Sequence, residues 1–243
     1  MSTDALGALT AALGKDRELL LGRSSTAERV AGILRDRIME GFLPPGTRLS
    51  EEALGGALGV SRNTLREAFR LLAHEKLLDH ELNRGVFVRT VSQENAVDLY
   101  RVRGFIETAA VRSLPTAPDS VLQALSAAAE EGERAAEESR WADVGTANMH
   151  FHQAIVALSC SPRLEDFMQQ VLAELRLVFH VMEDPRTFHE PYLRRNRKML
   201  AVLQARDAAA AEQILKEYLT DAENEIISAY KPAKAAAGGP NPS

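Results

Sequence analysis

The chain has 243 residues, with 29 basic and 34 acidic side chains and a formal net charge of −5 at pH 7. A hydrophobic share of 45% excludes a disordered chain, and the length fits one large domain or two modest ones. The single cysteine, Cys160, excludes an internal disulfide framework and a zinc cluster of several thiolates within one chain. We therefore expect a globular protein of a reducing compartment, the cytoplasm.

Neither end of the chain resembles a targeting or membrane segment. Charges interrupt every hydrophobic run before the ~18 to 20 apolar residues that a membrane-spanning helix needs. The first residues include Asp4 and lack the basic-then-apolar order of a secretory signal. We expect residues 1–23 to form a flexible leader and residues 232–243, rich in Ala, Gly and Pro, a flexible tail.

Three short helices are predicted after the leader. Apolar residues at helical spacing predict a first helix over residues 26–40, with Thr26 as its N-cap and the turn sequence GFLPPG as its end. Ser50 precedes two acids and is expected to cap a second helix, and Ser61 a third. The buried stripe of the third helix is expected to consist of Leu65, Ala68, Phe69 and Leu72. The second and third helices, joined by a tight turn, predict a helix-turn-helix.

A β-hairpin is predicted directly after these helices. The segment LLDHELNRGVFVRTV has two strand-like runs separated by Asn83-Arg84-Gly85, which is a turn sequence. A hairpin in this place is the wing of a winged helix-turn-helix. We assign residues 24–90 to this domain.

The remainder of the chain is predicted to be helical. Apolar periodicity runs from about Ser92 to Tyr230, and short loops force neighbouring helices to pack antiparallel. The fold class is therefore mostly α, a winged helix-turn-helix followed by an antiparallel bundle over residues 91–231. The six bundle helices are expected at about 92–114, 118–138, 139–159, 162–182, 186–206 and 208–230.

The first domain has the polar surface that DNA recognition requires. Residues 1–90 hold 13 basic and 12 acidic side chains, so the acidity of the chain lies in its second part. A recognition helix enters the major groove by its N-terminal end, where Arg pairs with guanine and Asn with adenine. An isolated Arg is usually a solvated surface residue, but the combination with a Gly-tipped wing favours DNA. The predicted DNA-binding residues are Arg48, Ser61, Arg62, Asn63, Thr64, Arg66, Arg84 and Gly85.

The segment GFLPPGTRLSEEALGGALGVSRNTLREAFRLLAHEKLLDHELNRGVFV resembles the winged helix-turn-helix of the GntR family of bacterial transcription regulators. The helical remainder resembles the FadR-type effector domain, an FCD-like domain, and the resemblance covers about residues 24–230. It implies DNA contacts by Arg62, Thr64 and Arg66 in the recognition helix and by Arg84 and Gly85 in the wing. Glu52 departs from the basic or amide residue of many relatives, and an acid there would repel phosphate.

The resemblance also implies a divalent metal site, from which this chain departs. FadR-type domains commonly hold the metal with an Asp-x-x-x-His pair and two later His residues, and those four positions fall on Asn148, His152, Asn196 and Tyr218. Only His152 is a retained ligand. Two amides and a phenol with a pKa near 10 lack the charge and softness of a Zn²⁺ or Ni²⁺ site. We expect no cofactor and no tightly held metal, and we interpret the four residues as a polar pocket.

Arg103 has two interpretations. It matches the family's Arg-x-x-x-Glu pattern with Glu107, so the resemblance implies that it faces the effector cavity and binds a carboxylate. Alternatively, Arg103 and Glu107 form a structural ion pair at i, i+4. His150 should face solvent or act as a cap, while His180, Met182 and His189 either line the mouth of a pocket or contact solvent.

The sequence thus predicts a transcription regulator, a repressor by the family's commoner mode, and excludes an enzyme because no nucleophile–base pair or phosphate loop is present. A homodimer would bind a palindromic DNA operator. A small organic acid would bind near Arg103, Asn148, His152, Asn196 and Tyr218. The alternative is a dimeric DNA-binding protein whose bundle has lost effector and metal binding and serves only dimerisation.

Overall fold

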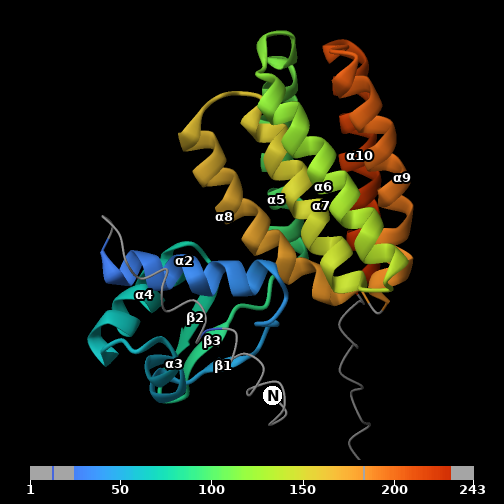
Figure 1. The fold of residues 1–243 in the computed structure, drawn as a ribbon. Helices are drawn as coiled ribbons and strands as arrows, with labels where there is room; N and C mark the ends of the chain where they lie inside the picture. Colours follow the sequence, from blue (N-terminus) through green and yellow to red (C-terminus); the bar gives the residue numbers. More distant parts are fainter. Residues whose placement is uncertain (1–12, 14–24, 183, 231–243) are drawn as a thin grey trace, which may run out of the picture.

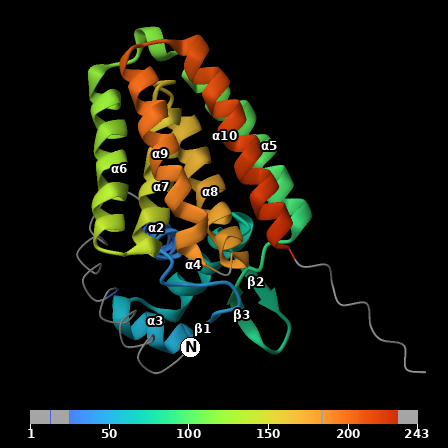
Figure 2. The same ribbon diagram turned by 90° about the vertical axis from the view of Figure 1, so that its right-hand side faces the viewer.

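The computed structural model describes Leu13, residues 25–182 and residues 184–230. The predicted leader, apart from Leu13, and the predicted tail lie outside these residues. The described residues form a small module of helices and strands at one end of a larger bundle of upright helices (Figure 1). Turning the molecule shows the small module beneath the bundle (Figure 2). The fold is therefore mostly α, as the sequence predicts.

The small module begins with three helices whose first turns are closed by serine caps. They are α2 (Thr26–Met39), α3 (Glu51–Leu58) and α4 (Arg62–His74). The hydroxyls of Ser50 and Ser61 accept the backbone N–H three residues later, so both predicted caps are confirmed. The predicted cap of α2 was wrong by one residue. Ser25 forms a capping box with Glu28, and Thr26 is already helical.

The wing is the larger part of a three-stranded antiparallel sheet. Strands β2 (Leu78–Glu81) and β3 (Gly85–Val88) form the predicted hairpin. A strand of two residues, β1 (Arg48–Leu49), pairs with the other edge of β3, which gives the order β1-β3-β2. This third strand was not predicted. It ties the loop before the helix-turn-helix to the wing and places Arg48 opposite Phe87.

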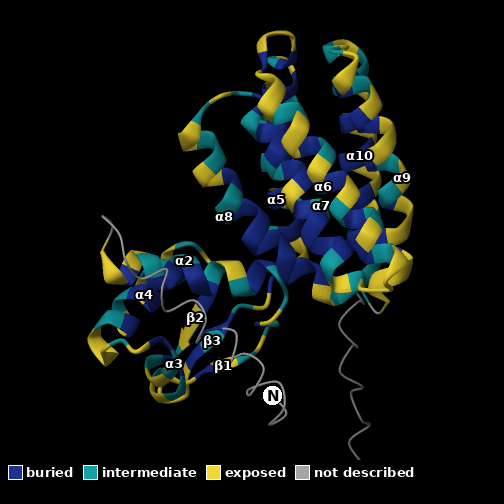
Figure 3. Ribbon diagram, viewed as in Figure 1, coloured by how far each residue is buried: buried dark blue, intermediate teal, exposed yellow. Residues whose placement is uncertain are grey.

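The core of the module is the predicted apolar stripe of α4. Its four residues, from Leu65 to Leu72, are buried against α2 and the sheet. The opposite face of α4 stays exposed, as the colours of Figure 3 show. The prediction of a one-sided helix in a helix-turn-helix is confirmed.

The bundle contains six long helices, and each overlaps one of the six predicted spans. They are α5 (Gln93–Val111), α6 (Asp119–Glu137), α7 (Trp141–Ala157), α8 (Pro162–Val178), α9 (Pro185–Gln204) and α10 (Ala208–Ala229). Short 3-10 turns, η2 (Leu114–Thr116) and η3 (Phe179–Val181), follow α5 and α8. Buried residues gather on the faces that the helices turn toward one another (Figure 3). None of the described helices has the length and apolarity needed to cross a membrane.

Helix α8 joins the bundle to the winged module. Its lower end packs against α2, and the two are side by side in Figure 1. Across this junction Arg89, just after β3, donates to Glu174 of α8 at 3.3 Å. Most of the Glu174 side chain is buried, and burial raises its pKa despite the neighbouring Arg89. The junction is therefore a packed interface that contains charged groups.

Candidate nucleic-acid interface and candidate effector site

The N-terminal half of α4 presents the predicted recognition residues to solvent. Arg62, Asn63 and Arg66 are exposed, because the apolar residues between them hold the other face of the helix in the core. The hydroxyls of Ser61 and Thr64 lie 2.8 Å apart, and Ser61 also accepts the Thr64 N–H. These two hydroxyls therefore cap and stiffen the first turn of the recognition helix.

Several exposed arginines of this surface are held by acids of the same module. The Nε of Arg66 donates to Glu51 of α3 at 2.9 Å. On α4 itself Arg70 pairs with Glu67, and at the wing Arg84 pairs with Glu81. Exposed pairs of this kind are weak, so the oxygens of an anionic ligand could replace these carboxylates.

The turn of the wing depends on left-handed backbone. Asn83 has a φ of 61° and Gly85 a φ of 113°. A side chain at Gly85 would be strained, and its Cβ would lie 3.3 Å from the Nε of Arg48. Arg48 and Gly85 are therefore neighbours, with the exposed Arg84 beside them, although 37 positions separate Arg48 from Gly85 in the sequence.

A groove of about 890 Å³ lies between the recognition helix and the wing. Asn63, Arg66 and Arg70 line it from α4, and Asn83 and Gly85 from the wing. Seven of the eight predicted DNA-binding residues are exposed, and Thr64 is half-buried. The structure thus brings Asn63, Arg66 and Gly85 to one concave surface, where polar and cationic donors lie beside the acids that pair with the arginines.

Inside the bundle, Glu107 connects two of the predicted effector residues. Arg103 Nε donates to Glu107 Oε1 at 2.7 Å, and His152 Nδ1 lies 2.6 Å from Glu107 Oε2. All three side chains are buried. Burial opposes ionisation of Glu107, but the charge of Arg103 and the hydrogen bonds from Arg103 and His152 outweigh it, so the pKa of Glu107 is lowered. The predicted ion pair of Arg103 with Glu107 is therefore present in the bundle interior, and the binding of a carboxylate by Arg103 stays a prediction.

The other three predicted effector residues, Asn148, Asn196 and Tyr218, are bonded to one another. The Nδ2 of Asn196 and the hydroxyl of Tyr218 both donate to Asn148 Oδ1, each at 2.8 Å. The ring of Tyr218 lies 5.0 Å from that of His152, so the four positions implied by the family resemblance do converge. His150, by contrast, is exposed, as predicted, and its Nδ1 lies 3.0 Å from a carboxylate oxygen of Glu131.

This cluster does not fit the divalent metal that the resemblance implies. Two donor hydrogens point at Asn148 Oδ1, the oxygen that a metal would need, and burial raises the pKa of the Tyr218 phenol. Burial also lowers the pKa of His152, which leaves a single neutral imidazole as a ligand. No cluster of three or more His, Cys, Asp or Glu suitable for a metal occurs among the described residues.

Three buried polar atoms of the cluster have no hydrogen-bond partner in the structure. They are Nη2 of Arg103, Nε2 of His152 and Oδ1 of Asn196. Buried polar atoms are nearly always paired, so these atoms are available to a ligand or to water. The adjoining cavity, lined by Asn148, His189 and Asn196, has a volume of only about 10 Å³, so the cluster is closed in this conformation.

A second buried arginine, Arg176, was not predicted from the sequence. Arg176 of α8 is 6% exposed, and it lies near His189 of α9, which is 3% exposed. Of the two alternatives predicted for His189, contact with solvent is therefore wrong. The residue does line the small cavity beside Asn148 and Asn196. Arg176 follows Glu174 in a regular helical pattern, and only the packing of α7, α8 and α9 reveals its surroundings.

Comparison with known proteins agrees with this geometry. Residues 26–88 match the bacterial regulatory proteins of the gntR family, and residues 98–221 match the FCD domain. A crystal structure of a GntR transcriptional regulator from Rhodococcus sp. RHA1 is 45% identical, with a TM-score of 0.79, and covers 86% of this chain and 100% of its own.

Two curated relatives match over most of their length. The HTH-type transcriptional regulator YdhC of Bacillus subtilis is 27% identical over 196 residues, which is 79% of this chain and 87% of YdhC. The HTH-type transcriptional repressor RspR of Escherichia coli is 26% identical over 200 residues, which is 82% of this chain and 88% of RspR. The similarity therefore spans both the winged module and the bundle.

Proposed function

Because the chain belongs to the gntR family of bacterial regulatory proteins and carries an FCD domain, it is a DNA-binding transcription regulator, and we propose that it is a repressor released by a small metabolite. It would act as a homodimer in the cytoplasm on a palindromic operator. The observation that carries the proposal is the groove between α4 and the wing, lined by exposed Asn63 and Arg66. The name of the Escherichia coli relative, a repressor, supports the sign of regulation.

Operator recognition would use the residues on both sides of this groove. Arg62, Asn63 and Arg66 would address base edges in the major groove, because Arg and Asn make the two-bond contacts that distinguish guanine and adenine. Ser61 and Thr64 would hold the first turn of α4 against the phosphate backbone. Arg48, Arg84 and Gly85 would bring the wing to the adjacent minor groove or its phosphates.

The effector would bind to the buried cluster around Asn148. The unpartnered atoms of Arg103, His152 and Asn196 supply donors and acceptors for a polar ligand, with Asn148 and Tyr218 completing the wall. A small organic acid is the proposed class. Entry requires an opening of the helices, since the adjoining cavity holds no more than about one water. Such an opening would couple the ligand to operator affinity, provided that the ligand binds the two states differently.

The closed state of the polar cluster around Asn148 also favours a second candidate function. The side chains of Asn148, Asn196 and Tyr218 already bond to one another, and Glu107 already neutralises Arg103. A bundle of this kind can serve only to dimerise a DNA-binding module, without any effector. In that case operator binding would not respond to metabolites.

Selection of bound sites from random DNA with the full-length protein tests both candidates. We expect a palindromic site whose half-sites lie about one helical turn apart. Adding organic acids one at a time to the purified complex then separates the candidates, because only the effector-responsive protein releases the DNA. Failure to enrich any sequence would contradict both.

A further inference from the structure

Arg176 is a buried cation without a counter-ion among the described residues. Among the residues that the structure describes, it makes one hydrogen bond, from Nη2 to the carbonyl of Ala142 at 3.1 Å, and its Nε has no partner there. No described acid lies within ion-pair distance of its guanidinium, whereas the buried Arg103 has Glu107 at 2.7 Å. Burying a charge without a partner costs several kcal/mol, so this arrangement calls for an explanation.

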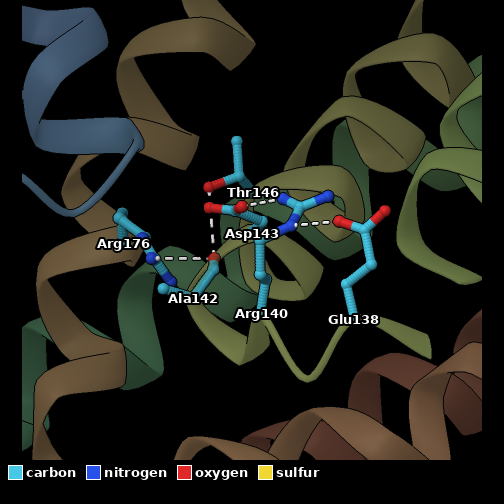
Figure 4. Close-up of polar contacts among 6 residues, drawn as sticks. All are labelled: Glu138, Arg140, Ala142, Asp143, Thr146 and Arg176. Atoms are coloured by element: carbon cyan, nitrogen blue, oxygen red, sulfur yellow. Dashed lines mark hydrogen bonds and ion pairs between the residues drawn. The ribbon is translucent and has the colours of Figure 1, made fainter. Parts of the chain in front are cut away.

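The nearest acid along α7 is already paired with another residue. Figure 4 shows the carboxylate of Asp143 turned toward Arg140, with which it forms an ion pair, while Arg140 also binds Glu138. The Arg176 side chain approaches the same turn of α7 and reaches only the backbone oxygen of Ala142. Burial therefore lowers the pKa of Arg176 to about 10, and the charge of Asp143 offsets only part of this effect.

Near the guanidinium of Arg176, a ring nitrogen of His189 also lacks a hydrogen-bond partner. His189 is buried against the rings of Phe179 and Phe188, with centroids 5.3 and 4.9 Å away, and its Nδ1 has no hydrogen-bond partner. Burial and the nearby charge of Arg176 lower the pKa of His189 to about 3. The ring is therefore neutral near pH 7 and offers one N–H donor and one acceptor.

The side chains of Arg176 and His189 both lie against Gly145 of α7. A Cβ built on Gly145 would lie 2.6 Å from Nη1 of Arg176 and 2.7 Å from Nε2 of His189, so both nitrogens converge on the same point. The Nη2 of Arg176 also abuts Gly41, in the loop that follows α2. The pair therefore lies where the bundle meets the winged module.

We propose that Arg176 and His189 form a binding site for a small carboxylate at this junction, separate from the Arg103–Glu107 ion pair. The guanidinium supplies the uncompensated charge and a planar set of donors, and the neutral imidazole supplies one more donor. The site rests on the proposed effector function, because it identifies the group that takes the acid of the effector. Asn148 and Asn196 line the same small cavity as His189, so the remainder of an effector would extend toward them.

Formate, the smallest carboxylate, tests the site in the full-length protein. It is titrated at constant ionic strength against chloride, while the ring resonances of His189 and the thermal midpoint are followed. We expect formate to shift the His189 resonances and raise the midpoint. In Arg176→Met the formate affinity should fall by roughly ten- to a hundredfold, the range for loss of hydrogen bonds to a charged group.

Two control variants sharpen the result. The exposed Arg134→Met should bind formate like the wild type. The double variant Arg103→Met/Glu107→Met is titrated beside it, to find which buried arginine the formate response depends on. If Arg176→Met does not fold, Gly145→Ala replaces it, since its methyl group occupies the point on which the two nitrogens converge. That variant should also lose the formate response.

Unchanged His189 resonances in the wild type would overturn the proposal, as would a formate response that depends on Arg103 rather than on Arg176. Operator binding is measured on the same samples, so that failure of the carboxylate site can be told apart from failure of the proposed DNA-binding function. A protein that binds DNA without a formate response rejects only the carboxylate site. A protein that responds to formate without binding DNA rejects only the proposed regulator.

Discussion

The Nε of Arg66 lies 2.9 Å from a carboxylate oxygen of Glu51, so an arginine of the recognition helix is paired with the first turn of the preceding helix. The Arg66 side chain is 64% exposed, which makes this pair weak and exchangeable. If Arg66 contacts DNA as we propose, Glu51 must release the guanidinium when DNA binds.

Replacing Glu51 with Gln should tighten operator binding by roughly two- to fivefold, because an exposed ion pair no longer competes with DNA and an acid next to phosphate is removed. Fluorescence anisotropy with a labelled operator measures the change. Glu130→Gln, an exposed acid of α6, is the matched control and should leave the affinity unaltered. Weaker binding by Glu51→Gln would show that the acid positions Arg66 for its DNA contact.

The wing and the recognition helix should contribute differently to DNA binding. Arg84→Ala removes a predicted backbone contact, so it should weaken binding to all sequences and lower the salt dependence by about one counterion. Arg62→Ala should weaken specific binding more than non-specific binding, by about 1–3 kcal/mol. Titrations against operator and scrambled DNA at several salt concentrations separate the two effects. Equal losses on both DNAs for Arg62→Ala would place Arg62 on phosphate instead.

Glu107 should be the most sensitive charged position of the bundle. Glu107→Gln leaves Arg103 buried and uncompensated, so we expect a loss of roughly 3–5 kcal/mol in the free energy of unfolding. Urea denaturation measures this loss. The double variant Arg103→Met/Glu107→Met removes both charges and should recover most of the stability. A single variant as stable as the wild type would mean that water reaches the pair.

The substituted metal positions should regain a metal when the family's ligands are restored. Asn148→Asp, Asn196→His and Tyr218→His together place an acid and two imidazoles around His152, because the native side chains already converge there. Native mass spectrometry should find about one Zn²⁺ per chain in the triple variant, removable by chelator. A wild-type protein that carries the same metal would contradict our assignment of the cluster.

His189 should make the protein sensitive to acid. Its pKa of about 3 in the folded state lies below the ~6.5 of an unfolded histidine, so the unfolded chain binds more protons between these values. The contribution of His189 to stability is therefore complete above about pH 6.5 and is lost as the pH falls toward 3. The unfolding free energy of His189→Gln should fall less steeply in this window, by up to ~1.4 kcal/mol per pH unit.

Urea denaturation from about pH 7 to about pH 4 checks the slope. Glu107, whose lowered pKa also makes acid destabilising, is present in both proteins and cancels from the comparison. The exposed His150→Gln is the matched control and should follow the wild type. Parallel curves for His189→Gln and wild type would mean that His189 titrates normally.

The parts of the fold that the sequence predicted are those with local causes. Serine caps at Ser50 and Ser61 and the turn at Gly85 depend on neighbours within a few residues, so their positions could be inferred from the chain alone. Strand β1 was missed because two residues are too short for any periodicity, and its partner lies across the module.

The residues of the candidate sites also differ in whether a local pattern in the sequence could predict their surroundings. Exposure of Arg62 and Arg66 follows from the periodicity of one helix, and the convergence of Asn148 and Asn196 came from the family resemblance. The surroundings of Arg176 depend on three helices and on the glycine at position 145. A buried arginine without an acid looks in the sequence like any solvated one.

The most direct test of the central claim is the affinity of the full-length protein for the DNA upstream of its own coding sequence, measured by anisotropy over a range of salt concentrations. We predict tight binding that weakens steeply with salt, with further loss in Arg62→Ala/Arg66→Ala and none in the exposed Arg134→Ala. Absence of binding at low salt, or equal binding by the double variant, would contradict the assignment of α4 and the wing as the DNA-binding surface.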